Sequence, residues 1–264
     1  MATQTNQKLA VVTGASSGIG LELARECAAH GFDLIVCAED DGIVEAARGL
    51  GGKVSARAVQ ADLSTREGVE ELWTQIQATG RAVDALILNA GVGVGGAFLD
   101  NELDDELDMI ALNCNHTVHL AKRVLPDMVR RGQGRVLITG SVVSTAPNPY
   151  QAVYGATKAF VMSFGEALRY ELKDRGVTVT VLQPGATDTE FFERAHLENT
   201  KVGQGKKDDP ALVARRGFEA MMDGKDSVLG GSFKSRLEGL ANEILPETFK
   251  AAQAGKKTKP EENS

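Results

Sequence analysis

The sequence has few of the residues that mark several protein classes. Its 264 residues include three cysteines, one tryptophan and seven prolines, and no run of 18 residues is apolar enough to span a bilayer. The number and spacing of Cys27, Cys37 and Cys114 fit neither a disulfide framework nor a metal-binding pattern. Each lies in an apolar stretch, which predicts buried, reduced thiols, and no metal site is expected.

Positive charge is also in deficit. The chain carries 29 lysines and arginines against 36 aspartates and glutamates, which gives a formal net charge of -7. A nucleic-acid partner requires a basic surface, and anionic membranes attract basic segments. We therefore expect neither a nucleic acid nor a membrane as a partner. The opening residues, MATQTNQK, contain no apolar signal region, so we expect a cytoplasmic protein.

Short apolar runs alternate with helical patterns along most of the chain. Strands are expected over 8–14, 33–38, 53–60, 84–91, 134–141 and 177–185. Helices are expected over 18–31, 41–50, 65–80, 104–131, 151–175 and 209–224. This order predicts an α/β protein with a three-layer, doubly wound parallel sheet (a Rossmann fold), in a single domain over 1–264.

The C-terminal part is less regular. A polar, glycine-containing stretch over 190–209 is expected to be a loop or lid, so residues 190–224 form the variable substrate region. DSVLGG, residues 226–231, is expected as a last short strand, followed by an amphipathic segment to Leu245. The polar tail over 254–264 is expected to be disordered.

The sequence TGASSGIG, residues 13–20, joins the first expected strand to the first expected helix. Glycines in such a turn let the backbone approach a ligand, and the N–H groups at the start of the helix favour a phosphate. The alternative is an ordinary tight turn. The position after a buried strand and before a helix favours a nucleotide site.

An acidic residue follows the second expected strand. Glu39 comes 19 positions after Gly20, and an acid about 20 residues beyond the glycines commonly bonds the ribose 2′-hydroxyl of NAD. A carboxylate would repel the 2′-phosphate of NADP, and the segment 38–40 supplies no positive charge. We therefore expect NAD to be preferred, with NADP possible. The alternative is that Glu39 and Asp40 are solvated charges at a helix start.

Tyr154 and Lys158 lie four positions apart on an expected helix and so share a face. A nearby ammonium lowers the pKa of a phenol from about 10, and such a tyrosine can exchange a proton with a carbonyl or hydroxyl oxygen. The alternative is packing beside a solvated lysine. Ser141 favours the chemical interpretation, because it ends an expected strand where open α/β sheets bind their ligands.

These motifs together resemble the short-chain dehydrogenase/reductase family, in its single-domain branch of about 250 residues. The resemblance covers roughly residues 8–190 and rests on TGASSGIG, the NAG over 89–91, Asn113, Ser141, the YGATK over 154–158 and the PGATDT over 184–189. It implies an NAD(P)-dependent oxidoreductase that transfers hydride between nicotinamide and a carbonyl or secondary alcohol.

The resemblance also implies roles for single residues. Tyr154 would be the general acid/base, and Lys158 would bind the nicotinamide ribose and lower the pKa of the phenol. Asn113 would take part in a proton relay with Lys158. The substrate would meet Ser141, Val143 and Tyr154. The cofactor would meet Gly14, Ser16, Ser17, Gly18, Ile19, Gly20, Glu39, Asp62, Leu63, Asn89, Ala90, Gly91, Tyr154, Lys158, Pro184, Gly185, Thr187 and Thr189.

Several features of the implied function follow from less specific signals. The pocket is expected to involve residues 92–98, Val142 and Val143, Tyr150, and Phe191 and Phe192 within the stretch 190–209, and these residues are mostly apolar, which suggests an apolar substrate. The resemblance implies a homodimer or homotetramer. The sequence departs from NAD-type members at Ala38, where they usually have an aspartate, so the acid comes one position later here.

Two other functions are compatible with the same fold. An epimerase or dehydratase of the extended branch would have a different glycine spacing and a larger region after the sheet. A cofactor-binding sensor or regulator without turnover would typically lack the tyrosine or the lysine. Both Tyr154 and Lys158 are present, which favours an enzyme.

Overall fold

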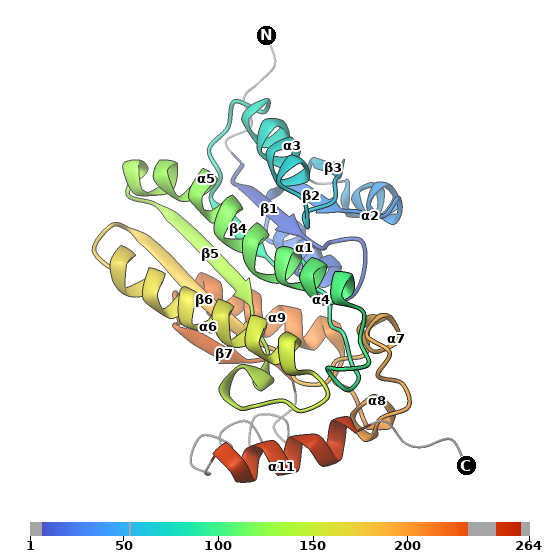
Figure 1. Cartoon of the computed structure of the whole chain (residues 1–264). Helices are drawn as coiled ribbons and strands as arrows, with labels where there is room; N and C mark the ends of the chain where they lie inside the picture. Colours follow the sequence, from blue (N-terminus) through green and yellow to red (C-terminus); the bar gives the residue numbers. More distant parts are fainter. Residues whose placement is uncertain (1–6, 53, 232–246, 260–264) are drawn as a thin grey trace.

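A seven-stranded parallel sheet forms the centre of the protein, as the alternating pattern predicts (Figure 1). The computed structural model describes residues 7–52, 54–231 and 247–259. The strand order is β3-β2-β1-β4-β5-β6-β7. The strands are β1 Leu9–Thr13, β2 Asp33–Ala38, β3 Ala56–Gln60, β4 Ala85–Leu88, β5 Gly134–Thr139, β6 Val177–Gln183 and β7 Ser227–Leu229. Because all strands are parallel, their carboxyl ends meet at one edge, and the order reverses direction between β1 and β4.

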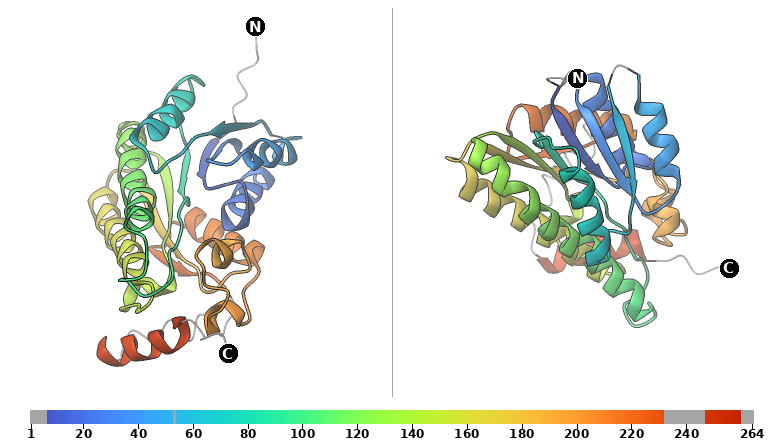
Figure 2. Two further views of the ribbon diagram at one scale, coloured as in Figure 1. Left: turned by 45° about the vertical axis from the view of Figure 1, so that its right-hand side comes forward. Right: turned by 90° about the horizontal axis from the view of Figure 1, so that it is seen from above.

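Helices cover both faces of the sheet, which gives three layers (Figure 2). One face is covered by α1 Gly18–Ala29, α2 Gly42–Leu50 and α9 Pro210–Met222. The other is covered by α3 Arg66–Gln77, α5 His116–Arg131 and α6 Ala152–Leu172. The remaining described helices are α4 Leu103–Ile110, η1 Ala111–Asn115, η2 Val142–Thr145, α7 Phe191–Arg194, α8 Lys201–Gln204 and α11 Glu247–Thr258.

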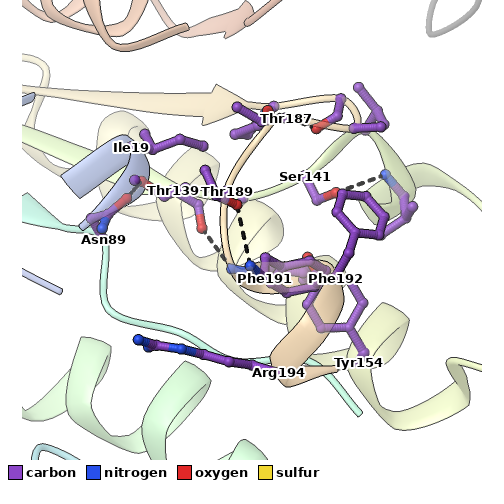
Figure 3. A pocket seen from close by; sticks show the side chains of 18 of the residues that line it. Ile19, Asn89, Thr139, Ser141, Tyr154, Thr187, Thr189, Phe191, Phe192 and Arg194 are labelled. Carbon is purple, nitrogen blue, oxygen red and sulfur yellow. Dashed lines mark hydrogen bonds between the residues drawn. The ribbon is translucent and has the colours of Figure 1, made fainter. Parts of the chain in front are cut away.

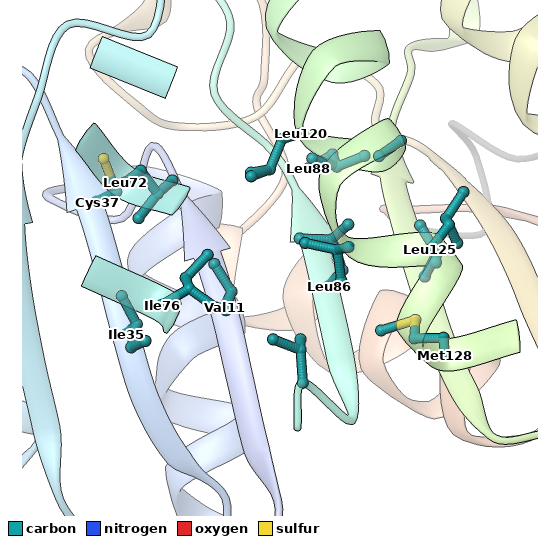
Figure 4. Packing of buried hydrophobic residues seen from close by; sticks show 14 of the residues in the cluster. Val11, Ile35, Cys37, Leu72, Ile76, Leu86, Leu88, Leu120, Leu125 and Met128 are labelled. Carbon is teal, nitrogen blue, oxygen red and sulfur yellow. The ribbon is translucent and has the colours of Figure 1, made fainter. Parts of the chain in front are cut away.

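The continuous apolar runs of the strands are explained by burial on both faces. Successive side chains along a strand point to opposite faces. On β1, Val11 belongs to the core under α3 and α5, with Ile35 and Leu86 on neighbouring strands (Figure 4). Val12 belongs to the core under α1 and α9. Burial of each of these aliphatic side chains contributes about 1.5–3 kcal/mol to the stability of the fold. The two cores therefore hold in place the strand ends that carry the site.

Two sequence expectations need correction. The helix expected over 104–131 is present, but a π-helical turn over Ala111–Asn115 separates α4 from α5. The tail was expected to be disordered from residue 254, which is wrong for 254–258, because α11 extends to Thr258. There the Thr258 hydroxyl donates a hydrogen bond of 2.7 Å to the Pro149 carbonyl. The amphipathic segment expected up to Leu245 lies outside the described residues after Gly231.

The three cysteines are buried and free, as predicted. Burial raises the pKa of the Cys37 thiol to about 12 and raises the pKa of Cys27 as well, so both stay protonated and behave as core side chains. In the described residues, no cluster of histidine, cysteine and acidic side chains could bind a metal ion. No helix in the described part of the chain is long and apolar enough to cross a bilayer.

Candidate active site

The glycine-rich turn between β1 and α1 has no room for side chains. Gly14 has φ +64°, and a Cβ there would lie 2.8 Å from the Cα of Ala90. A Cβ at Gly20 would lie 1.9 Å from the Gly14 carbonyl oxygen. The close packing of the turn therefore requires glycine at these positions. No side chain covers the backbone of the turn at the carboxyl edge of the sheet.

The start of α1 presents backbone N–H groups without a side-chain partner. Ser17 is the N-cap residue, yet its side chain accepts no capping hydrogen bond from the described residues, and the first turn of α1 contains no acidic residue. The first N–H groups of a helix lack partners within the helix and attract anions. The turn and this helix start together fit the pyrophosphate of a dinucleotide.

Acidic side chains lie beside this turn at the end of β2. The Ser16 hydroxyl donates a hydrogen bond of 2.7 Å to the Asp40 carboxylate. Glu39 is exposed, and both acids line the same cavity as Gly14 and Ser17. Glu39 is the acid that its spacing from the glycines predicts to bind the ribose, whereas no sequence pattern predicts that Asp40 is fixed against the glycine turn.

A buried threonine and histidine connect the turn to β4. The Thr13 hydroxyl accepts hydrogen bonds of 3.0 Å from the backbone N–H groups of Asn89 and Ala90. His116 is 1% exposed; its Nδ1 lies 2.8 Å from the Leu112 carbonyl oxygen and its Nε2 lies 3.3 Å from the Thr13 hydroxyl. We assign the proton to Nδ1, because the carbonyl can only accept, so Nε2 accepts from Thr13. This contact positions the NAG segment.

We predict that His116 makes the stability of the fold depend on pH. Burial is the main cause that lowers its pKa from 6.5 to about 4, and Lys158 and His119 add repulsion. Between about pH 4 and pH 6.5, His116 therefore binds a proton in the unfolded chain but not in the folded chain. This contribution to stability is complete above about pH 6.5 and is lost at about 1.4 kcal/mol per pH unit as the pH falls toward 4.

Urea unfolding at about pH 7.5, 6 and 5 measures this contribution. The free energy of unfolding of His116→Gln should fall less steeply with decreasing pH than that of the wild type. His30→Gln is the matched control, because the His30 side chain is 55% exposed. Parallel pH profiles for the wild type and His116→Gln would contradict the prediction.

Tyr154 and Ser141 lie at the carboxyl ends of β5 and β6 (Figure 3), and Lys158 lines the same cavity. Tyr154 and Lys158 lie on the first turns of α6 and are 7% and 6% exposed. Ser141 lines the same cavity as Tyr154 and lies near enough to its phenol to influence its pKa. The Lys158 ammonium donates a hydrogen bond of 3.0 Å to the Thr139 carbonyl and lies 5.8 Å from the centroid of the Tyr154 ring. The residues of the proposed proton chemistry therefore share one buried site.

The pKa of Tyr154 moves in the opposite direction from the one expected. Burial raises it from 10.0 to about 12, while the Ser141 side chain lowers it by less. Burial also lowers the pKa of Lys158 to about 8. Because removal from water disfavours both charged forms, the lysine does not offset the desolvation of the phenol. The expected lowering of the Tyr154 pKa is therefore wrong for this structure, in which Tyr154 is protonated near neutral pH.

Asn113 lies in the π-helical turn and binds the segment after β4. Its side-chain oxygen accepts a hydrogen bond of 2.9 Å from the Val92 N–H, and its side-chain nitrogen donates to the Val92 carbonyl and to the Thr157 hydroxyl, each at 2.9 Å. A Cβ at Gly91 would lie 2.9 Å from the Asn113 side-chain oxygen and 3.3 Å from the Lys158 Nζ. Asn113 and Lys158 therefore approach the same stretch of backbone.

Two short helices and their connections, residues 190–204, lie over the Tyr154 side of the site; we call this segment the lid. Phe191 on α7 packs against Tyr154 with ring centroids 5.3 Å apart, and Phe192 packs edge-on against Phe191. A Cβ at Gly93 would lie 2.6 Å from the Phe191 ring, and the Gly95 N–H donates to the Ala195 carbonyl at 2.9 Å. The 92–98 stretch thus supports the lid, and the two phenylalanines form the wall of the site.

Two adjoining cavities collect most of the predicted site residues. The Tyr154 cavity has a volume of about 230 Å³, near the lower end of the usual range of about 300–1,000 Å³ for ligand sites. It is lined by Ser17, Gly18, Ile19, Gly20, Asn89, Ser141, Val143, Tyr154, Lys158, Pro184, Gly185, Thr187 and Thr189, among others. The second, the Glu39 cavity, is lined by Gly14, Ser16, Ser17, Glu39, Leu63, Ala90 and Gly91, among others.

Two predicted residues lie outside both cavities. Asp62 is not among their lining residues, and its carboxylate accepts hydrogen bonds from the N–H and hydroxyl of Ser64. Asn113 is likewise absent from both linings. Arg194 and Thr139 also line the site, although the sequence motifs did not predict either of them. Thr139 belongs to no motif that the sequence shows. Arg194 lies in the stretch 190–209, whose structure the pattern of residues does not predict.

Comparison with known proteins yields consistent matches. The family model described as short chain dehydrogenase matches residues 8–199. The chain is 36% identical over 189 residues to an uncharacterized short-chain type dehydrogenase/reductase, y4eK, of Sinorhizobium fredii, covering 71% of this chain and 73% of that protein.

Solved structures agree with these matches. A short-chain dehydrogenase from Sphingobium yanoikuyae in complex with NADPH superposes with a TM-score of 0.79 and 29% identity, covering 89% of this chain and 92% of that one. A bulky-bulky ketone specific alcohol dehydrogenase from Comamonas testosteroni superposes with a TM-score of 0.76 and 28% identity, covering 91% and 96%.

Proposed function

From the premise that this chain belongs to the short-chain dehydrogenase/reductase family, and is an NAD(P)-dependent oxidoreductase, we propose that it interconverts an apolar ketone and the corresponding secondary alcohol. The observation that carries this proposal is the buried Tyr154, which shares a cavity with Ser141 and faces an apolar wall next to the glycine-rich turn. This arrangement supports a role for Tyr154 as the proton donor to a carbonyl oxygen beside the nicotinamide.

The residues present fit a nicotinamide dinucleotide. The crowded glycines leave the turn free of side chains, and the α1 start offers N–H groups to a pyrophosphate. We propose that Asn89, Ala90 and Gly91 flank the cofactor and that Pro184, Gly185, Thr187 and Thr189 meet its nicotinamide end. When bound, the cofactor supplies or accepts the hydride.

The chain's own residues manage the substrate oxygen and its proton. Ser141 donates a hydrogen bond to the substrate oxygen and so helps to orient the carbonyl carbon. Tyr154 gives its phenolic proton to the same oxygen as negative charge develops there. Lys158 binds the nicotinamide ribose, and Asn113 belongs to the relay that returns a proton to Tyr154. The lid phenylalanines exclude water from this exchange.

We propose carbonyl reduction as the direction for which the site is prepared. A tyrosine with a pKa near 12 is almost entirely protonated at neutral pH, so the acid form that reduction requires is already present. Alcohol oxidation requires the phenolate, which is scarce at this pH. The apolar side chains of Val142, Val143, Phe191 and Phe192 along the Tyr154 cavity support an apolar substrate.

NAD is our proposed cofactor, on the basis of charge at the Glu39 cavity. Glu39 and Asp40 both line it, and a 2′-phosphate beside two carboxylates would be repelled. The three unpaired, buried cysteines suit a reducing compartment and support the cytoplasm as the proposed location. A homodimer or homotetramer is supported by apolar surface on α6, where Phe160 is 43% exposed.

A ketone panel with NADH tests this function. We expect the purified chain to oxidise NADH with apolar ketones and to act much more weakly on small charged keto acids, because an apolar wall cannot compensate the desolvation of a carboxylate. The measurement is the loss of NADH absorbance over time. Tight NADH binding without turnover of any ketone would instead favour a cofactor-binding sensor.

A further inference from the structure

A lid arginine lies where the two halves of the site join. Arg194 is the last residue of α7, and it lines both the Tyr154 cavity and the Glu39 cavity. Among the described residues that line these two cavities, only Ser17 shares this property. Ser17 is the N-cap of α1, so Arg194 borders the cleft together with the anion-attracting start of that helix.

The side chain of Arg194 is directed along the cleft. Figure 3 shows it leaving α7 with its guanidinium end pointing away from Tyr154. The side chain is 51% exposed, and one guanidinium nitrogen donates a hydrogen bond of 2.6 Å to Glu190, four residues earlier. Arginine has five N–H donors, so this single contact with an exposed carboxylate leaves most of them available to a ligand.

The charges around the cleft also point to an anionic ligand at this position. In the described part of the chain, Arg194 is the only lysine or arginine that lines the Glu39 cavity, while Glu39 and Asp40 are acidic. In the Tyr154 cavity the other cation is Lys158, which is buried and donates to the Thr139 carbonyl. The negative charge of a ligand that crosses from one cavity to the other therefore meets Arg194 near the α1 start.

We propose that Arg194 binds the pyrophosphate of the dinucleotide and thereby links cofactor binding to the position of the lid. This inference rests on the proposed function. The planar guanidinium can donate two parallel hydrogen bonds to phosphate oxygens, which a lysine cannot reproduce. The α1 N–H groups contact the pyrophosphate from the sheet side, and Arg194 contacts it from the lid side.

The same short helix carries the wall of the substrate site. Phe191 precedes Arg194 by three residues and packs on Tyr154. A pyrophosphate bound by Arg194 therefore favours the lid position in which Phe191 covers Tyr154. Arg194 is thus a cofactor-binding and positioning residue on a segment that otherwise serves the substrate.

Fluorescence titration with NADH tests the inference without any turnover. Arg194→Gln should weaken NADH binding about 10- to 100-fold, the usual effect of losing hydrogen bonds to a charged group. Arg194→Lys should recover only part of this loss. ADP-ribose, which keeps the pyrophosphate, should compete with NADH less well in Arg194→Gln than in the wild type, whereas adenosine, which lacks phosphate, should compete equally in both.

Two further variants complete the design. Arg48→Gln removes an arginine from α2 whose side chain is 70% exposed and which lines neither cavity, so it should bind NADH as the wild type does. Glu190→Gln removes the carboxylate that competes for Arg194, so it should bind NADH more tightly. This second variant tests the inference even if Arg194→Gln folds poorly.

The possible outcomes separate this inference from the proposed function. If the wild type binds NADH and both Arg194→Gln and Glu190→Gln bind it equally well, the inference is overturned and the proposed function stands. If Arg194→Gln weakens only NADPH, Arg194 contacts a 2′-phosphate, which also overturns the inference. If the wild type binds neither NADH nor NADPH, the proposed function itself fails, and this inference fails with it.

Discussion

Tyr154→Phe is expected to lower kcat about 100- to 10,000-fold, the usual contribution of a general acid, while NADH affinity stays close to that of the wild type. The change removes only the phenolic oxygen and keeps the ring that packs on Phe191 at 5.3 Å. The site then lacks its proton donor, although Ser141 can still bind the substrate oxygen. Steady-state ketone reduction and NADH fluorescence titration measure the two quantities separately.

Tyr170→Phe provides a matched control for this experiment. Tyr170 lies on the same helix, α6, and is 71% exposed, so the loss of its hydroxyl should change neither kcat nor NADH affinity. Wild-type turnover by Tyr154→Phe would show that another group supplies the proton. A loss of NADH affinity equal to the loss of turnover would show that Tyr154 mainly binds the cofactor.

Glu39→Arg is expected to reverse the cofactor preference. We expect the wild type to bind NADH about 10- to 100-fold more tightly than NADPH, because Glu39 and Asp40 repel a 2′-phosphate at the end of β2. An arginine at this position can form charge-assisted hydrogen bonds with that phosphate. Parallel fluorescence titrations with NADH and NADPH give both ratios.

The controls separate a local effect from a change in net charge. Glu45→Arg introduces the same charge change on α2, at a side chain that is 73% exposed and lines neither cavity, so it should leave the preference unchanged. Asp40→Asn tests the acid that is bound to Ser16. Equal affinity of the wild type for both cofactors would show that Glu39 faces solvent and that the proposed NAD preference is wrong.

Much of the fold could be predicted because its signals are local. The apolar runs that end at Thr13 and Leu88 are buried on both faces of the sheet, and continuous hydrophobicity reports such burial directly. The order of strands and helices then leaves few arrangements, since crossovers between parallel strands have one hand. The π-helical turn at Asn113 could not be predicted from the sequence. A single π-helical turn inside a helix leaves the spacing of apolar residues around it almost unchanged.

The candidate site was predictable where residue type and spacing together specify a chemical arrangement. The glycines of 13–20 are recognisable from their spacing between a strand and a helix, and Tyr154 and Lys158 share a helix face by their spacing alone. Residues brought to the site by the path of a loop gave no such signal. Arg194 and Asp40 are examples, because their positions depend on how α7 and the end of β2 pack.

The sequence by itself determined the order of strands and helices, the glycine turn and the tyrosine–lysine pair, because residue types at short spacings mark each of them. Only the tertiary structure decided how the lid packs on Tyr154, which residues line both cavities and how the site titrates. Burial raises the pKa of Tyr154 to about 12, although the helix spacing alone favours the opposite shift. Desolvation depends on every atom that excludes water from the phenol, and those atoms come from segments far apart in the chain.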